Sequence, residues 1–201
     1  MISIIDYGAG NIGSIKNMIK KIGLKSTITR DIDEIKNSTH IILPGVGSFD
    51  YGMNNLKNLN LKDILNHMVL DKKVPFLGIC LGMQLITKSS EEGDLPGLGW
   101  IDAEVIKFKF DDNTFKIPHM GWNFVEIKKN NKILSEEELQ RFYFVHSFHV
   151  KCNSEKDVIS KTNYNYNFVS AINKDNIYGV QFQPEKSHKY GKTLLDKFLK
   201  L

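Results

Sequence analysis

The sequence predicts one α/β domain in which helices flank a mixed, mostly parallel central sheet, and three observations carry this prediction. Short apolar runs alternate with helical periods through the first half of the chain, which is typical of βα units. After Gly99 the pattern changes to closely spaced strands, which indicates antiparallel pairing. No linker, repeat or low-complexity segment divides the 201 residues, so we expect a single domain over 1–201.

The first half of the chain is predicted to contain four strands with helices between them. Residues 1–6 form a short apolar strand, and a glycine turn then leads into a helix that ends at Gly23. The isoleucines of this helix recur at helical spacing and form one apolar stripe. The other strands are expected at 25–29, 40–43 and 74–79, and the other helices over 53–70 and 81–88.

The second half is predicted to be mainly strands with one helix after them. Its apolar and aromatic runs are short and are bounded by polar turn residues, which is the pattern of strands. We expect strands at 103–108, 124–127, 143–150, 157–161, 167–172 and 177–182, and a helix over 189–200.

Composition argues against several classes of protein. The net charge of +4 comes from dispersed lysines and not from a basic stripe of the kind that binds nucleic acid. Cys80 and Cys152 form neither a disulfide framework nor a metal-binding spacing. No apolar run reaches the ~20 residues of a membrane span, and the start lacks a signal-peptide pattern. We therefore expect a cytoplasmic protein with reduced thiols, no metal, no cofactor, and neither nucleic acid nor membrane as a partner.

The stretch FLGICLGMQL places Cys80 in the tight turn between a strand and a helix. Gly78 and Gly82, two residues to either side, permit the sharp and strained turn that presents a nucleophile, as in elbows built on serine. The helix N-terminus favours the thiolate, and the N–H of Leu81 can bond to an oxyanion. The alternative interpretation is a small buried cysteine between two packing glycines.

A second glycine turn, LPGVGSFD, follows the strand at 40–43. The C-terminal ends of neighbouring strands in a doubly wound sheet line one crevice, so this turn should lie beside Cys80. Gly45 and Gly47 would let backbone N–H groups approach a substrate and complete an oxyanion hole. A plain connection between strand and helix is the alternative.

The stretch GVQFQPEKS reads as the end of a buried strand that runs into a charged turn. Pro184 ends ladder hydrogen bonding, and period-2 geometry would put Gln183 and Glu185 on the same side of the chain. A carboxylate two residues beyond a polar side chain is typical of a group that orients a catalytic base. A neutral amide, however, cannot take up a thiol proton and return it to a leaving group.

Together these motifs resemble the class I, triad-type glutamine amidotransferases, whose pattern is G-x-C-x-G-x-Q followed by H-P-E. DYGAGNIGS, PGVGSFD, PHMGWN, YFVHSF and GVQFQPEKS, which span nearly the whole chain, are similar to the glutaminase subunits of imidazole glycerol phosphate synthases. The resemblance implies a single class I glutamine amidotransferase-like domain that hydrolyses glutamine to glutamate and ammonia. It also implies a heterodimer with a TIM-barrel cyclase subunit, which uses the ammonia to make imidazole glycerol phosphate in histidine biosynthesis.

The resemblance assigns roles to individual positions. Cys80 matches the nucleophile and Glu185 the orienting carboxylate, while Gln183 stands where the family has its basic histidine. The matched substrate-binding positions, with the oxyanion donors, are Val46, Gly47, Leu81, Gln84, His146, Ser147 and Phe148. The matched positions at the cyclase interface are Asn11, Trp122 and Lys186.

Gln183 departs from the family pattern, and we expect it to impair turnover. Three explanations stay open: a deliberate replacement that traps a complex, a natural paralogue with weak or abolished activity, or a base elsewhere. His188 is the nearest substitute, whereas His146 and His149 are expected to face opposite sides of one strand. Two other functions stay open as well. One is a paralogue that supplies ammonia for a cell-surface sugar, and the other is an inactive docking module that activates its partner.

Overall fold

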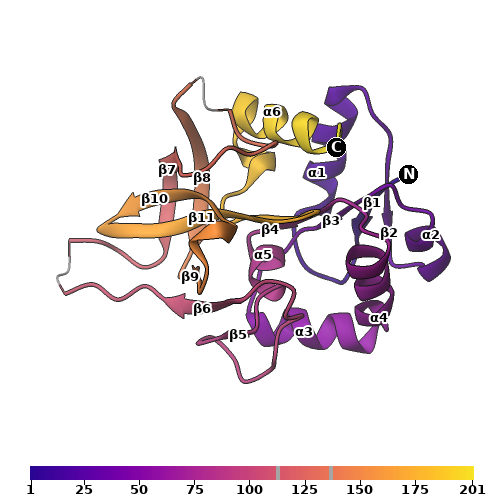
Figure 1. Ribbon diagram of the computed structural model, residues 1–201, viewed down its shortest axis with the longest axis horizontal. Helices are drawn as coiled ribbons and strands as arrows, with labels where there is room; N and C mark the ends of the chain where they lie inside the picture. The colour runs from indigo at the N-terminus through magenta and orange to yellow at the C-terminus, as the bar shows by residue number, and fades with distance from the viewer. Residues whose placement is uncertain (112–113, 136–137) are drawn as a thin grey trace.

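A mixed sheet carries the architecture, and helices pack on both of its faces (Figure 1). The computed structural model describes residues 1–111, 114–135 and 138–201. The strand order is β2-β1-β3-β4-β12-β11-β10-β7-β8, with β5, β6 and β9 off this path. The last strand in the chain, β12, therefore lies inside the sheet, parallel to β4 on one side and antiparallel to β11 on the other. The predicted α/β class with a mixed sheet is confirmed.

The parallel half of the sheet comes from the first half of the chain together with β12. Its inner strands are short and mostly apolar because helices cover both faces. Its elements are β1 (Ile2–Ile5), α1 (Ile12–Ile22), β2 (Ser26–Thr29), α2 (Ile32–Lys36), β3 (His40–Leu43), α3 (Phe49–Asn58), α4 (Leu61–Asn66), a π-helical turn (His67–Asp71), β4 (Phe76–Ile79), α5 (Leu81–Leu85) and β12 (Ile177–Val180).

The antiparallel half comes from the second half of the chain. It extends the sheet beyond β12 and adds a side branch in which β9 links β11 to β6. Its elements are β5 (Ser89–Ser90), β6 (Ala103–Lys107), β7 (His119–Ile127), β8 (Gln140–His146), β9 (Phe148–Cys152), a 3₁₀ turn (Glu155–Asp157), β10 (Val158–Tyr164), β11 (Tyr166–Lys174), a second 3₁₀ turn (Pro184–Lys186) and α6 (His188–Phe198).

Helix α1 illustrates how the sequence sets the bounds of an element. The side-chain oxygen of Asn11 accepts a hydrogen bond from the N–H of Ser14 at 3.4 Å and caps the first turn. Gly23 ends the helix in the left-handed region, at φ 95°, where a residue with a side chain is disfavoured. Ile15 and Ile19 form the buried face in between.

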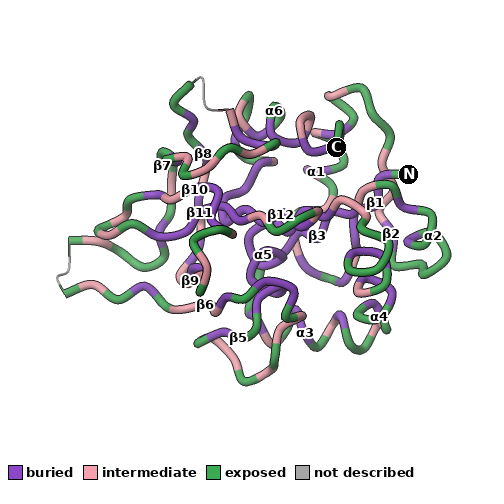
Figure 2. The backbone as a smooth tube through the Cα atoms, viewed as in Figure 1, coloured by how far each residue is buried: buried purple, intermediate pink, exposed green. Residues whose placement is uncertain are grey.

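Two hydrophobic cores lie on opposite faces of the parallel half. Ile4 and Ile42 pack with α1 and α6 on one face, and Ile5 and Leu43 pack with α3, α4 and α5 on the other. This division follows from the alternation of side chains along a strand. Figure 2 shows the resulting band of buried chain through the centre of the molecule.

Several predicted elements differ in detail from the structure. The helix expected over 53–70 begins at Phe49 and is broken at Asn60, whose left-handed backbone (φ 55°) separates α3 from α4. Helix α5 is shorter than expected, and the hydroxyl of Thr87 donates a hydrogen bond to the carbonyl of Gln84 near its end. The strand expected over 143–150 is two strands, with a break at Ser147. Helix α2 was not expected at all.

No helix in the described part of the chain combines the length and the apolar character needed to cross a bilayer.

Candidate active site

Cys80 occupies a strained turn between β4 and α5, as the sequence predicts. Its backbone angles are φ 53° and ψ −109°, which a residue with a side chain rarely adopts. The turn is closed by glycines: a Cβ on Gly82 would lie 1.9 Å from the carbonyl oxygen of Leu43, and one on Gly78 would lie 2.6 Å from that of Gly82. The N–H of Cys80 donates to Val180 at 2.8 Å, which ties the turn to β12.

The environment of Cys80 favours the neutral thiol. Burial raises its pKa to about 11 and is the largest cause, and the charge of Glu185 raises it further. The N–H of Leu81 and the side-chain amides of Gln183 and Gln181 act against this by hydrogen bonding to the sulfur. Because the thiol stays protonated at neutral pH, a nucleophilic Cys80 needs a group that accepts its proton.

A cavity of about 160 Å³ opens beside the sulfur of Cys80. Its walls come from the loop after β3, the start of α5 and the junction of β8 with β9. The lining residues are Val46, Gly47, Cys80, Leu81, Gln84, Glu92, Val145, His146, Ser147 and Phe148. The seven positions matched to substrate binding are thus all brought to this one cavity.

Two lining residues, Glu92 and Val145, were missed by sequence reasoning. Glu92 lies in an irregular segment, and its carboxylate accepts the N–H of Phe49 at 2.9 Å, so it caps the start of α3. Burial raises the pKa of Glu92, while this hydrogen bond lowers it. No periodic pattern surrounds Glu92, whereas Val145 precedes the matched His146 on a strand and could have been found from it.

The glycine turn after β3 lies directly against the elbow. A Cβ on Gly45 would lie 2.6 Å from the Cβ of Leu81, so only glycine allows this approach. Gly47 has a positive φ of 121°, and Val46 beside it is half exposed at the cavity. Backbone N–H groups of this turn and of Leu81 are therefore available around one cavity, as an oxyanion hole requires.

The corner that follows β12 places an amide and a carboxylate next to Cys80. Gln183 is buried; its N–H donates to Tyr143 at 2.9 Å, and its carbonyl accepts the hydroxyl of Ser187 at 2.7 Å. Residues 184–186 form a 3₁₀ turn, so the expected extended alternation ends at Pro184. Gln183 and Glu185 nevertheless both act on the thiol of Cys80, one by hydrogen bonding and one by charge.

Glu185 has an unpaired oxygen in this corner. Its Oε2 is buried and makes no hydrogen bond to any described residue. Burial is the main cause that raises the pKa of Glu185. A buried carboxylate oxygen without a donor is costly, and an imidazole N–H at position 183 is the kind of group that would satisfy it.

Comparison with known proteins decides the family. The sequence profile of the family described as glutamine amidotransferase class-I matches residues 3–201. The chain belongs to the class-I glutamine amidotransferase family. It is 59% identical over 201 residues to the imidazole glycerol phosphate synthase subunit HisH 2 of Methanococcus maripaludis, covering 100% of this chain and 99% of that protein. It is 45% identical over 204 residues to the HisH subunit of Leptospira interrogans, covering 100% of both.

A solved structure supports the same fold. The crystal structure described as a glutamine amidotransferase aligns with a TM-score of 0.78 and covers 99% of this chain and 97% of that one. At 16% sequence identity, this similarity concerns the fold alone. The chain is thus a glutamine amidotransferase by family and by fold.

The histidine that lines the cavity of this amidotransferase is already fully hydrogen-bonded. His146 donates from Nδ1 to the carbonyl of Phe148 at 2.7 Å, so its Nε2 accepts from Nδ1 of His119, at 3.0 Å. Burial lowers the pKa of His146 to about 3. His146 is therefore neutral at physiological pH, with neither ring nitrogen directed at Cys80.

The expectation that His146 and His149 face opposite sides of one strand is wrong. Both rings pack on Phe108, with centroids 5.2 and 4.7 Å away, because the break at Ser147 reverses the alternation. His149 continues this cluster through a 2.9 Å hydrogen bond to the hydroxyl of Tyr166. These histidines are part of an aromatic core in the antiparallel half.

His188 lies on the surface and not in the corner beside Cys80. Its ring stacks on that of Trp122, with a centroid distance of 5.6 Å and an interplanar angle of 4°. Trp122 in turn contacts the ring of Tyr143, and the ammonium group of Lys186 lies over the same ring, 5.7 Å from its centroid. Two of the matched interface positions, Trp122 and Lys186, thus meet around Tyr143, while Asn11 begins helix α1, which packs on the 3₁₀ turn that contains Lys186.

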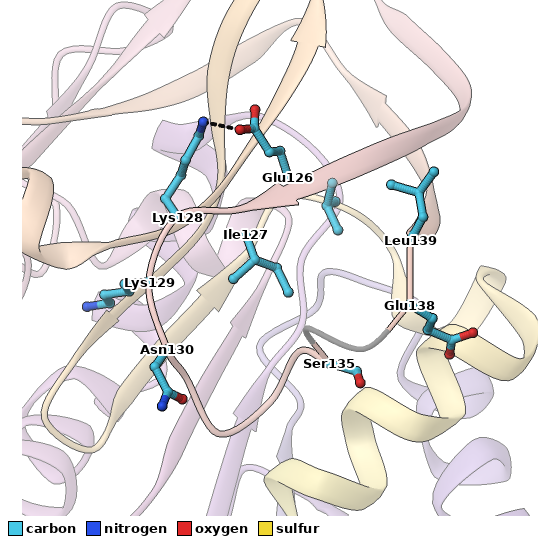
Figure 3. A pocket seen from close by; sticks show the side chains of 9 residues that line it. Glu126, Ile127, Lys128, Lys129, Asn130, Ser135, Glu138 and Leu139 are labelled. Carbon is cyan, nitrogen blue, oxygen red and sulfur yellow. Dashed lines mark hydrogen bonds and ion pairs between the residues drawn. The ribbon is translucent and has the colours of Figure 1, made fainter.

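A second hollow, near the antiparallel half, is separate from this site. It has a volume of about 560 Å³ and lies between the end of β7 and the residues that lead into β8 (Figure 3). Its lining carries lysines, an ion pair between Glu126 and Lys128, and no cysteine. No group of three histidine, cysteine or carboxylate side chains is placed to hold a metal ion in the described ranges.

Proposed function

We propose that this chain is the glutaminase subunit of an imidazole glycerol phosphate synthase, which works in histidine biosynthesis. It releases ammonia from glutamine and passes it to a TIM-barrel cyclase subunit. The observation that carries the proposal is the single cavity that joins the strained Cys80 to the turn at Val46–Gly47 and to His146–Phe148. The relatives named HisH point to the same acceptor reaction. We place the enzyme in the cytoplasm, where a thiol nucleophile stays reduced.

The reaction begins with attack of the Cys80 sulfur on the side-chain carbonyl carbon of glutamine. As the S–C bond forms, the carbonyl oxygen becomes an oxyanion, which the N–H groups of Leu81 and of the Val46–Gly47 turn can stabilise. Collapse breaks the C–N bond, and the nitrogen leaves as ammonia once it has received a proton. Water then hydrolyses the thioester to glutamate and the free thiol.

Gln183 slows this reaction at two proton-transfer steps. The amide can hydrogen-bond to the thiol, but it neither accepts the thiol proton nor delivers one to the departing nitrogen. We propose that Gln183 lowers turnover by ~10²–10⁴-fold or more relative to a histidine there. Binding of glutamine is expected to persist because the cavity itself is intact.

We propose that the cyclase docks on the surface that carries Asn11, Trp122 and Lys186. Trp122 is 42% exposed although it is a large aromatic side chain, and Met120 and Phe124 project beside it at 61% and 50% exposure. An exposed apolar row of this kind on one face of β7 is typical of an interaction site. A glutaminase that works only when docked would avoid wasting glutamine.

The test compares glutamine with ammonium salt as nitrogen donors in the complex with the cyclase. Ammonium salt should support synthesis with the chain as it stands, while glutamine should support it only weakly. Gln183→His should restore the glutamine-dependent rate by at least 100-fold and leave the ammonium-dependent rate unchanged. Cys80→Ala in the Gln183→His background is the control and should abolish only the glutamine-dependent rate. If Gln183→His turns over glutamine no faster than the parent chain, position 183 does not supply the proton acceptor and this part of the proposal is wrong.

The alternative is a second acceptor pathway, since some relatives carry a number that distinguishes subunits of the same name. A paralogue could supply ammonia for a cell-surface sugar through the same half-reaction. Purifying the native complex and identifying the bound synthase subunit separates the two acceptors.

An inactive docking module is favoured by the unpaired Oε2 of Glu185. In that case the chain activates its partner without using glutamine. The ammonium-dependent rate of the complex would then exceed that of the cyclase alone, and Cys80→Ala would leave all rates unchanged. The same assays therefore separate the docking module from a slow glutaminase.

A further inference from the structure

A line of buried hydrogen bonds joins the cavity wall to the nucleophile through a residue that has no assigned role. The side-chain nitrogen of Gln84 donates both to the carbonyl of Phe148 and to Oε1 of Gln181, each at 3.2 Å. The side-chain nitrogen of Gln181 then donates to the sulfur of Cys80 at 3.7 Å. Gln181 is fully buried and, unlike Gln84, does not line the cavity.

The carbonyl of Phe148 at one end of this line determines which group donates in each of its hydrogen bonds. The carbonyl of Phe148 can only accept, so Gln84 turns its NH₂ group toward it. The same NH₂ group meets Gln181, which must therefore present its oxygen to Gln84 and its own NH₂ group to Cys80. The carbonyl of Phe148 thus fixes the orientation of both side-chain amides, and the sulfur of Cys80 receives a hydrogen bond from Gln181.

The backbone explains why Gln181 can reach the sulfur. Its N–H donates to Ser170 at 2.9 Å, which holds the segment against β11 beyond the end of β12. Phe182 points the other way and stacks on Phe142 with a centroid distance of 3.9 Å. Gln181 and Gln183, on either side of Phe182, therefore both point at Cys80.

We propose that Gln181 is a positioning residue that ties the thiol of Cys80 to the amide of Gln84. These two groups must contact the same glutamine molecule, one at the reacting carbon and one at the binding end, and a single buried amide fixes their separation. Because both protons of the Gln84 amide are used inside the protein, its oxygen is the atom left to accept a hydrogen bond from the substrate. The inference deepens the proposed glutaminase function and rests on it for the identity of the substrate.

Thiol alkylation tests the contact with Cys80 without any glutamine turnover. The rate of reaction with iodoacetamide is measured against pH for the parent chain and for Gln181→Met, which has a similar volume but no N–H. Loss of the donor should raise the pKa of the thiol by about one unit, so that alkylation near neutral pH slows about tenfold. Gln140→Met is the matched control, because Gln140 is also a buried glutamine but hydrogen-bonds to Ser135, and it should leave the profile unchanged.

The contact with Gln84 is tested by glutamine kinetics in the Gln183→His background. Gln181→Met removes one of the two acceptors that hold the Gln84 amide, so the KM for glutamine should rise about tenfold along with a fall in kcat, while the ammonium-dependent rate stays unchanged. If Gln181→Met does not fold, Gln181→Asn replaces it, since an amide one methylene shorter cannot reach both partners. An alkylation profile and a KM equal to those of the parent would overturn the proposal. A shifted alkylation profile without any glutamine turnover would instead count against the proposed function alone.

Discussion

The two halves of the sheet hold their parts of the site by different means. In the parallel half, the elbow depends on close contact between backbone segments. At Gly78 and Gly82 a Cβ atom would collide with a neighbouring backbone, and Cys80 is held at a positive φ. In the antiparallel half, the opposite wall depends on side chains, because His119 and His146 are set by hydrogen bonds and by packing around aromatic rings. The first half supplies Cys80 and the turn at Val46–Gly47, and the second supplies the opposite wall of the cavity.

Because of this difference, we expect the two halves to lose stability under different perturbations. A fold held by backbone contact is sensitive to one added methyl group and insensitive to pH. A wall built from buried neutral histidines tolerates small changes of shape but is sensitive to acid. Three experiments test this contrast.

The largest effect is expected from Gly82→Ala. The new Cβ would lie 1.9 Å from the carbonyl oxygen of Leu43, which belongs to β3 and cannot move without breaking the sheet. We expect a loss of more than about 4 kcal/mol in the free energy of unfolding, or no folded protein at all, as measured by urea denaturation.

Gly13→Ala is the matched control for this substitution. Gly13 lies in helix α1, and a Cβ there would meet no atom within 4 Å. Alanine should stabilise the helix by about 0.5–1 kcal/mol. Equal stability of the two alanine variants would show that the elbow does not depend on the close approach of β3 and α5.

The next effect is a loss of stability in acid that comes from the antiparallel half. Burial lowers the pKa of His119 to about 4, that of His146 to about 3 and that of His149 to about 4, from an ordinary value of 6.5. Between pH 4 and 6.5 the unfolded chain therefore binds more protons than the folded one. The contribution of these neutral histidines to the free energy of unfolding is fully present above pH 6.5. It is lost as the pH falls, by about 1.4 kcal/mol per pH unit for each histidine.

Urea denaturation at several values between pH 7.5 and pH 5 measures this slope. His149→Phe keeps an aromatic ring against Phe108 and removes one titrating group, so the slope should fall by about one proton. A slope that stays the same in His149→Phe would show that other groups dominate the acid response.

The smallest effect concerns the outer face of the antiparallel half. Trp122→Ala should weaken binding of the proposed cyclase partner by about 2 kcal/mol, or ~30-fold in Kd, as measured by titration calorimetry. Ile32→Ala is the control, because Ile32 is equally exposed, at 40% against 42%, but lies on α2 in the parallel half. If both variants bind the partner as tightly as the parent, the row on β7 is not the docking surface.

The parallel half could be predicted closely from the sequence. Its strands are short apolar runs, and its first helix has both a capping side chain and a closing glycine, so local chemistry and tertiary position agree. The prediction was less accurate where a single residue interrupts a helix or a strand while the apolar periodicity of the sequence continues across it. Asn60 breaks a helix whose apolar pattern continues, and Ser147 breaks a strand whose neighbours remain apolar.

The antiparallel half was harder to predict because its strands pair over long distances in the sequence. Strand β7 begins at His119, earlier than expected. Met120, Trp122 and Phe124 alternate with Gly121 and Asn123, but the glycine weakens the strand pattern and the apolar side chains are on the exposed face. All the residues along the cavity except Glu92 and Val145 could be assigned from motifs. Gln181 could not, because its position is defined by the tertiary contact with Gln84 and not by any local pattern.

The place of β12 has a consequence for how the protein is synthesised. The ribosome delivers β4 and the elbow early, but β12 (Ile177–Val180) emerges after all other strands and must insert between β4 and β11. Until then the N–H of Cys80 lacks its partner on Val180, and the segment from Gln181 to Glu185 has not been translated. A chain interrupted before Gln181 therefore carries a thiol without these contacts, and the surroundings of Cys80 are completed only after β12 and the corner beyond it have been made.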